Sequence, residues 1–566
     1  MNGKITQALS SKESGDITKY FDEVDKIISL NDGIHDNKML SMECYDRPTP
    51  VKYNQYTKFH ISDAGIDCIN IDKSYITASM TYHMSLTKTA TSTLPSGNTT
   101  DADREIFYQL FIGLKNASHN IDTYRIYINH NQIYSQTDSI YEQALTTAMK
   151  PKPEMYRPHM YSMWDEVHKH SQNVCGVYVP IREKVGTEFD ITFDIAIQLD
   201  DLLPFSGMSI FPSCVIGDLE LEIRNRIQGN LVYCQVDPNV IVEEITGSII
   251  GDGSDAVSSK IAGVGSSWYE AIPNMKKEVQ TAKYTKEFTQ VGDVARVCSH
   301  AYENSALGDY CASYDVILQC TNSTMNNAMS HINGFRLKDS VITALRNRYS
   351  TKPLIIPAQV CKHDLFAQRP TAGGLKLNTN ITLTNCTNIA LSFPQTDNQI
   401  SVVHNPEQQS AQLIVMGKNI PDKSINTLEA AHAEMSLTNA CLDSLFEAQP
   451  SFIRSLTKSS SNGSRKIYLP ADATDYYFNV SLERFGNGVF CDGLTSPGAI
   501  TLTFQSNSIN PGIGDAYYHY DILDNTKLNT QPINIMTVED CFWVITPEKV
   551  WLTNDVYTPE ITETKE

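Results

Sequence analysis

The feature that most limits the possible folds of this chain is a strict alternation of apolar and polar residues over residues 187–199. A strand places successive side chains on opposite faces, whereas a helix would spread these residues around its circumference. The segment therefore predicts a β-strand with one buried face and one solvated face. The predicted buried residues are Phe189, Ile191, Phe193, Ile195, Ile197 and Leu199.

Similar alternation recurs along the chain and predicts further strands. Residues 219–227 place Leu219, Leu221 and Ile223 on one face, and residues 477–485 and 499–504 follow the same pattern. Residues 124–136 predict a hairpin that turns near Asn129–Asn131, because asparagine tolerates the backbone conformation of tight turns.

Predicted helices are few and do not alternate regularly with strands. Helical spacing occurs after Asp16, after Asp138 and after Ser424. A parallel α/β fold is therefore disfavoured, and two large antiparallel sandwiches with long loops fit better.

One stretch rich in glycine and serine, residues 247–268, interrupts the alternation and predicts a boundary. The expected organisation is an N-terminal arm at residues 1–50, a first sandwich at 51–246, a linker at 247–268 and a second sandwich at 269–566.

Charge and composition limit the classes of molecule that the chain could bind. The 566 residues contain 45 Lys and Arg against 65 Asp and Glu, a net charge of −20. The first 50 residues hold six basic and nine acidic residues, so no basic arm for nucleic acid is present. No apolar run reaches the length of a membrane span, and no apolar signal sequence opens the chain. We therefore expect a protein that is made inside a cell and is not secreted.

A search for chemical motifs predicts no catalytic, cofactor-binding or metal site. The chain lacks a phosphate-binding P-loop, an H-E-x-x-H zinc motif and a nucleophile elbow. Its 13 cysteines contain no C-x-x-C pair and are expected to be reduced. His168 and His170 near Cys175, and the acidic pairs Asp200–Asp201 and Asp521/Asp524, are better interpreted as loop surface.

The N-terminal helix is the one candidate interaction element. Its apolar residues share one side, and its polar side carries acidic as well as basic residues, which favours docking on protein over an anionic membrane. The predicted docking face consists of Ile17, Tyr20, Phe21, Val24, Ile27 and Ile28.

Four segments carry a resemblance to a known family. They are residues 189–226, 390–422, 478–504 and 541–552. In the first segment a turn begins at Ile197-Gln198-Leu199, and Gln198 stands where the family usually has proline. The chain resembles the double jelly-roll major capsid proteins of Polinton/Maverick and adinto-like elements, virophages and nucleocytoplasmic large DNA viruses.

The resemblance implies an all-β fold of two consecutive eight-stranded antiparallel jelly-roll sandwiches with a few inserted helices. It further implies homotrimeric, pseudo-hexagonal capsomers that tile an icosahedral shell around double-stranded DNA. The implied partners are neighbouring capsomers, a penton protein, minor capsid or cement proteins and, for the N-terminal segment, an internal membrane; the implied location is the virion.

Two other functions stay open at this point. A β-sandwich carbohydrate-active or glycan-binding protein would need exposed tryptophans and a convergent carboxylate pair, and the chain has only four tryptophans. A fibrous attachment spike would be expected to contain repeats, and none is found.

Overall fold

The computed structural model describes most of the predicted strand regions. The described residues are 34–43, 51–62, 65–88, 105–114, 116–148, 176–184, 188–227, 231–236, 282–288, 294–298, 314–350, 353–368, 376–393, 400, 403, 408–415, 417–426, 430, 477–482, 493–506, 531–546 and 549–553.

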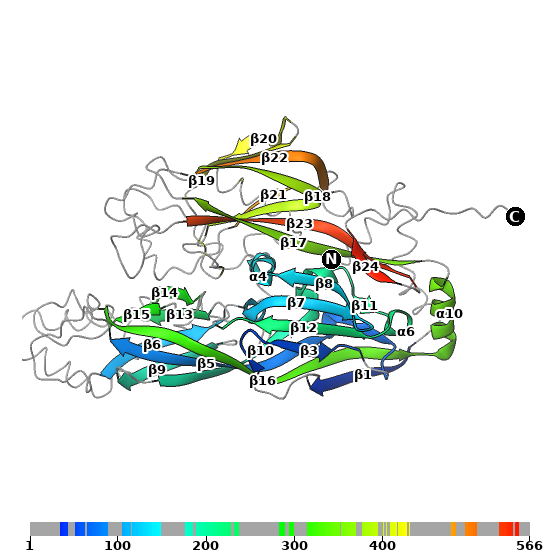
Figure 1. The fold of residues 1–566 in the computed structure, drawn as a ribbon, viewed down its shortest axis with the longest axis horizontal. Coiled ribbons are helices and arrows are strands. Elements are labelled where there is room, and N and C mark those ends of the chain that lie inside the picture. The colour runs from blue at the N-terminus through cyan, green and yellow to red at the C-terminus, as the bar shows by residue number, and fades with distance from the viewer. Residues whose placement is uncertain are drawn as a thin grey trace, which may run out of the picture.

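The first region of the chain forms a sandwich of two antiparallel sheets (Figure 1). The first sheet has the central order β1 (Ile34–Glu43), β16 (Tyr314–Leu337), β5 (Tyr75–Lys88) and β10 (Glu188–Gln198). The second has the order β3 (Tyr56–His60), β12 (Leu219–Asn225), β7 (Ile121–Ile128) and β8 (Asn131–Thr137). Short strands β2 (Val51–Lys52), β4 (Cys68–Asn70), β11 (Ile210–Phe211) and β15 (Val294–Cys298) extend the first sheet.

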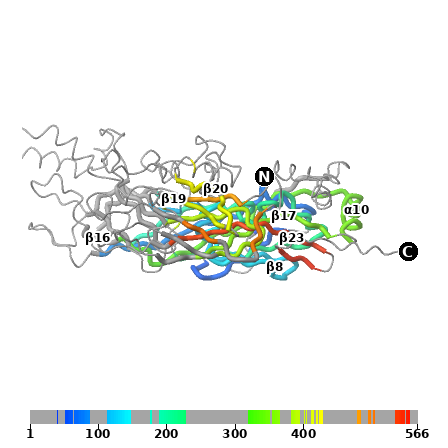
Figure 2. The backbone as a smooth tube through the Cα atoms, turned by 90° about the horizontal axis from the view of Figure 1, so that it is seen from above, coloured from blue at the N-terminus to red at the C-terminus, as the bar shows by residue number. Residues whose placement is uncertain are grey.

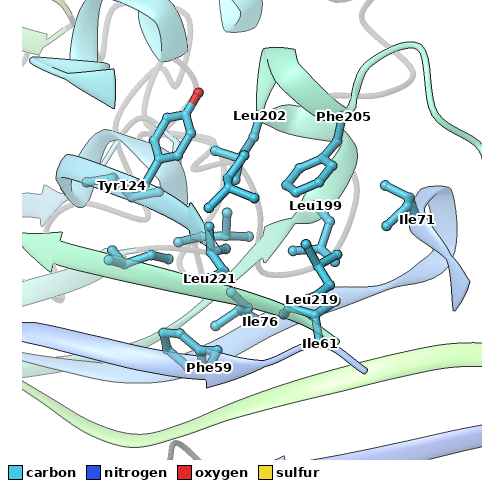
Figure 3. Packing of buried hydrophobic residues seen from close by; sticks show 14 of the residues in the cluster. Phe59, Ile61, Ile71, Ile76, Tyr124, Leu199, Leu202, Phe205, Leu219 and Leu221 are labelled. Carbon is cyan, nitrogen blue, oxygen red and sulfur yellow. The ribbon is translucent and has the colours of Figure 1, made fainter. Parts of the chain in front are cut away.

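Alternation explains which face each sheet buries. In β10, Ile191 and Phe193 are buried, whereas Asp190 and Asp194 are exposed, as predicted. Two positions differ from the prediction: Ala196 is buried although it lies on the predicted polar side, and Phe189 is only half-buried. Apolar side chains from both sheets meet in one core, where residues of the connection after β10 pack over β12 (Figure 3).

The predicted hairpin between β7 and β8 is confirmed. Asn129 and His130 form the two-residue turn, and both have positive φ, at 50° and 64°. Two positive φ angles match the twist of the flanking strands, and asparagine tolerates this conformation better than most residues.

The connections between strands of this sandwich differ sharply in length at its two ends. Those after β5, β8 and β12 are long and contain strands β6 (Glu105–Gly113), β9 (Gly176–Lys184), β13 (Leu231–Val236) and β14 (Ala282–Phe288). These four strands pair with one another in the order β14-β13-β6-β9. Because successive strands run in opposite directions, the long connections all leave one end, where Figure 1 shows the extra sheet.

The predicted boundary between the sandwiches is wrong. Strands β14, β15 and β16 follow residues 247–268 in the chain, yet β14 pairs with β13 and β16 pairs with β1 and β5. The first sandwich therefore extends to Leu337, and 247–268 falls inside the connection between β12 and β16. Residues 247–268 themselves, like most of the arm at 1–50, lie outside the described residues.

The second sandwich region begins after helix α10 (Asp339–Tyr349). Its strands form one eight-stranded antiparallel sheet. The central order is β17 (Leu354–Gln368), β23 (Gln531–Ile545), β18 (Lys376–Ser392), β22 (Leu494–Ser506), β19 (Gln408–Val415) and β20 (Lys418–Ile425), with β21 (Tyr477–Ser481) on β18 and β24 (Val550–Thr553) on β23. A second core cluster lies on β18, β19, β21, β22 and β23.

The predicted all-β fold with two consecutive sandwich regions and few helices is thus confirmed. In both regions a strand from the beginning pairs with a strand from near the end. β1 pairs with β16, and β17 pairs with β23 along its whole length. Helix α4 (Ser139–Ala148) lies where a helix was predicted. Ser424, in contrast, lies within β20, so no helix begins directly after it.

The two sandwich regions pack against each other and form a thin slab when seen from above (Figure 2). Helix α4 and the short helical turn η6 (Leu203–Phe205) of the first region contact β17, β18 and β23 of the second. We call this contact the joint. It is a continuous apolar interface, because buried residues of both regions pack together in it.

Candidate assembly surfaces

The joint contains a buried carboxylate. Glu142 on α4 accepts hydrogen bonds from the Tyr124 hydroxyl, at 3.0 and 2.9 Å from its two oxygens, and from the backbone N–H of Leu203 at 2.9 Å. Burial raises the pKa of Glu142 from 4.5 to about 7, although both hydrogen bonds act in the opposite direction. The carboxyl is therefore a group whose charge changes near neutral pH inside the joint.

Aromatic packing fixes the remainder of the joint. The indole N–H of Trp543 on β23 donates to the carbonyl of Pro204 at 2.7 Å, and this tryptophan is 1% exposed. Its ring stacks on Phe205 with 6.2 Å between ring centroids. Tyr141 on α4 stacks on His363 of β17 at 3.4 Å.

Close backbone contact also holds the two regions together. A Cβ atom added to Gly207 would lie 2.2 Å from the carbonyl oxygen of Pro357 on β17. Only glycine permits this approach, so the two sandwich regions are matched in shape as well as in polarity.

The outer face of β3, β12 and β7 carries a ladder of paired charges, called the basic ladder below. Glu220 contacts Lys58 at 2.7 Å and His130 at 3.0 Å. Burial raises the pKa of Glu220, but the hydrogen bonds and charges of Lys58 and His130 outweigh it and lower that pKa overall.

The next rung of the basic ladder joins Glu222 to Arg125 at 3.2 Å and to the Tyr127 hydroxyl at 3.0 Å. Beyond it, the Nε of Arg224 donates to Asp122 at 2.7 Å. With Lys58, Arg125, Arg224 and Arg226 against Asp122, Glu220 and Glu222, cationic side chains outnumber carboxylates by four to three. This excess is notable in a chain whose net charge is −20.

The opposite side of the slab carries an acidic ladder, on the outer face of β10 and β5. Asp190 contacts His83 at 2.5 Å, and Asp194 accepts from the Ser79 hydroxyl. Thr192 and Thr81 form a hydrogen bond of 3.0 Å between them. The ion pairs of the basic ladder thus contain one more cation than carboxylates, and the acidic ladder carries the carboxylates Asp190 and Asp194.

Most of the candidate residues named from the sequence lie outside the part of the chain that the structure describes. The N-terminal docking face at residues 17–28 lies outside the described residues, as do His168, His170, Cys175, Asp521 and Asp524. Asp201 is 3% exposed, so this acidic residue is not loop surface as predicted. Within the described part of the chain, no group of three or more His, Cys, Asp or Glu side chains could hold a metal ion. Among the described helices, none is long and apolar enough to cross a membrane.

Sequence reasoning missed the residues of the joint. Glu142 lies on a predicted helix, but its partners Tyr124 and Leu203 stand 18 and 61 residues away. The only local signal is a glutamate among the apolar residues of that helix.

Comparison with known proteins gives matches only among solved structures. No family model matches the chain, and no curated protein matches it. The chain is similar to a structure of the Sputnik virophage, with 11% identity and a TM-score of 0.45, covering 94% of this chain and 91% of that one. It is also similar to the mavirus major capsid protein, with 8% identity and a TM-score of 0.40, covering 92% and 91%.

A third similar structure is PBCV-1 VP54 fitted into a reconstruction of the Sputnik virophage. Its identity is 10% and its TM-score 0.42, covering 92% of this chain and 97% of that one. At such low identity, the similarity concerns the course of the chain and not individual residues.

Proposed function

We propose that this chain is a major capsid protein, a structural and non-enzymatic component of an icosahedral virion that encloses double-stranded DNA. The observation that carries the proposal is the tandem of two closed β-sandwich regions, with the long connections of the first region gathered at one end. Such a molecule offers flat lateral faces for packing and a separate end for variable loops.

The sequence resemblance supports the same role. Residues 189–226 run from β10 through β12, residues 478–504 include β21 and much of β22, and residues 541–552 include the end of β23 and most of β24. The resemblance implies that residues 189–226 close the first jelly roll, and this part is wrong, because the strand that closes the first sandwich against β1 is β16.

The two ladders support assembly from several copies. Since the basic ladder and the acidic ladder lie on opposite sides of the slab, copies arranged head to tail in a closed ring would bring unlike faces together. A ring of three copies contains six sandwiches, which gives a pseudo-hexagonal homotrimer. Such capsomers would meet neighbouring capsomers at their edges, and a penton protein would close the vertices.

The N-terminal segment would add a second kind of contact. Its apolar residues, Ile17 to Ile28, would dock on a neighbouring capsomer or on a minor capsid or cement protein, with an internal membrane as the alternative. An acidic chain does not neutralise packaged DNA by itself, so another component or cations would have to do so.

The alternative of a glycan-binding sandwich has less support. Of the two tryptophans that the structure describes, Trp543 is buried in the joint and Trp551 is half-buried beside Lys549. Neither forms the exposed aromatic platform on which a sugar stacks.

The native mass of the purified chain, measured together with negative-stain images of the same peak, tests the proposal. We expect a species of about three times 63.2 kDa with hexagonal projections. A stable monomer at all concentrations would contradict the capsomer.

A charge-reversal variant then tests the contact between faces. Asp190→Lys combined with Asp194→Lys should weaken the trimer, because the acidic ladder would then repel a basic ladder. Asn347→Lys adds positive charge on the exposed side of α10, away from both ladders, and serves as the control. Equal trimer stability in both variants would refute the pairing of the ladders while leaving the capsid role open.

A further inference from the structure

Two cysteines lie together at the end of the first sandwich where the connections are short. Cys68 begins β4, and Cys214 lies in the short helix α6 (Ser213–Ile216). The two segments are neighbours, because β4 pairs with β11 directly before α6, with Ile69 opposite Phe211. Helix α6 follows β11 directly, so Cys214 lies three residues after Phe211.

Hydrogen bonds hold α6 against the segment that leads into β4. The N–H of Cys214 donates to the carbonyl of Asp67 at 3.0 Å, and the Ser213 hydroxyl donates to the carbonyl of Ile66 at 2.9 Å. Cys214 is thus anchored beside the residue that precedes Cys68. The Cys68 thiol is also a hydrogen-bond partner of the Cys214 side chain.

The surroundings make Cys214 the more reactive partner. The hydrogen bond from Cys68 lowers the pKa of Cys214, Arg346 on α10 acts in the same direction, and burial and Asp67 oppose them without reversing the result. Cys214 is partly exposed, whereas Cys68 is 0% exposed. A lowered pKa combined with access to solvent is the condition under which a thiol reacts with a disulfide.

The other four cysteines whose side chains the structure describes have different surroundings. Burial raises the pKa of Cys320 to about 12, and it also raises the pKa of Cys361, Cys386 and Cys541. All four are buried. Low reactivity is therefore expected for these four.

We propose that Cys68 and Cys214 form an oxidisable dithiol that a low-molecular-weight disulfide, such as oxidised glutathione, converts into a Cys68–Cys214 disulfide. The Cys214 thiolate attacks one sulfur of the reagent, forms a mixed disulfide and releases one thiol. The Cys68 thiolate then attacks the sulfur of Cys214, which forms the internal bond and releases the second thiol. Two protein thiols are oxidised and one reagent disulfide is reduced, so atoms and electrons balance.

The bond would strengthen the point from which the chain leaves the first sandwich. Asp67 accepts a hydrogen bond from the N–H of Leu337 at 2.9 Å, and the Nε of Arg346 donates to the Cys214 carbonyl at 3.1 Å. The dithiol therefore lies between the last residue of β16 and helix α10, which leads into the second sandwich region. This inference does not depend on the capsid role, because it concerns the purified chain alone.

The test is peptide mapping of the full chain after incubation with oxidised glutathione, with free thiols alkylated before digestion. We expect a linked peptide pair that contains Cys68 and Cys214, with a loss of about two mass units that dithiothreitol reverses. Alkylation of the reduced chain under native conditions should modify Cys214 before Cys68. Absence of the linked pair, or a pair between other cysteines only, would overturn the proposal.

Two variants test the order of steps. Cys68→Ser should stop at the mixed disulfide and retain one glutathionyl group on Cys214, whereas Cys214→Ser should leave Cys68 unmodified. Cys320→Ser, which removes a buried thiol elsewhere in the same sandwich, should still form the bond. If Cys68→Ser does not fold, the mapping of the unmodified chain still decides whether the bond forms.

Discussion

The buried carboxyl of Glu142 makes the stability of the joint dependent on pH. We consider the substitution Glu142→Gln, which removes the charge and keeps a side chain of almost the same shape. A glutamine oxygen can still accept from Leu203 and from Tyr124, and its amide can donate to the Tyr124 oxygen. The substitution therefore isolates the cost of the charge.

The magnitude follows from the change in pKa. The pKa of Glu142 rises from 4.5 to about 7 on folding, and one pKa unit corresponds to about 1.4 kcal/mol. Ionised Glu142 thus destabilises the folded chain by about 3 kcal/mol relative to its protonated form. Between pH 4.5 and 7 the folded chain binds more protons than the unfolded chain, so stability falls as pH rises, and the full cost is present above pH 7.

The assay is urea denaturation followed by circular dichroism at several pH values between 5 and 8. We expect the natural chain and Glu142→Gln to have similar free energies of unfolding at pH 5. At pH 8 the variant should be the more stable by up to about 3 kcal/mol. Glu188→Gln removes the same charge from an exposed position of β10 and controls for net charge.

Parallel pH curves for the natural chain and Glu142→Gln would refute the reasoning, because they would mean that Glu142 does not titrate in this range. A variant less stable than the natural chain at pH 8 would mean that hydrogen bonding by the carboxylate outweighs its desolvation.

Three further predictions concern the joint and the arm. Gly207→Ala should destabilise the joint by about 1–3 kcal/mol, measured by the same denaturation, because its Cβ would overlap the carbonyl of Pro357. Trp543→Phe should cost about 1–3 kcal/mol, because the buried carbonyl of Pro204 loses its donor; an unchanged midpoint would contradict this. Deletion of residues 1–30 should leave soluble trimers but impair shell assembly in particle counts by electron microscopy, and normal particles would contradict the docking role.

Strands with uninterrupted alternation could be predicted from the sequence. β10 needed only its own pattern, because eleven residues pair with β5 without a shift in register. The hairpin between β7 and β8 was equally local, since Asn129 and His130 adopt the conformations that the turn requires.

The closing strand β16 could not be predicted in the same way. Two register shifts, between Cys320 and Asn322 and between Asn326 and Met329, change which positions face the core. The phase of alternation among the buried residues therefore changes several times along the strand, and these residues include serines as well as apolar side chains. A search for one unbroken period misses such a strand.

The same strand explains the incorrect boundary. Glycine and serine at 247–268 indicate a long loop, but composition does not reveal which strands a loop connects. If β16 is not recognised, the first sandwich lacks its closing strand and the loop resembles a linker. The residues of the joint were also beyond reach, because Glu142, Leu203 and Trp543 come from distant segments that only the folded chain brings together.

The two ends of the first sandwich differ in a way that would let the chain keep its assembly contacts while the sequence of its loops changes. At one end, turns such as Asn129–His130 and the segment around Gly217 are short and held by hydrogen bonds between the Asn129 side chain and the backbone of Ile216 and Asp218. At the other end, the long connections contribute the sheet β14-β13-β6-β9, and β15 from the last of them pairs with β16. Insertions between β5 and β6, or between β13 and β14, would fall outside the sequence of both ladders and of the joint. If the lateral faces hold copies together, selection can therefore alter the long connections without altering the geometry of the assembly.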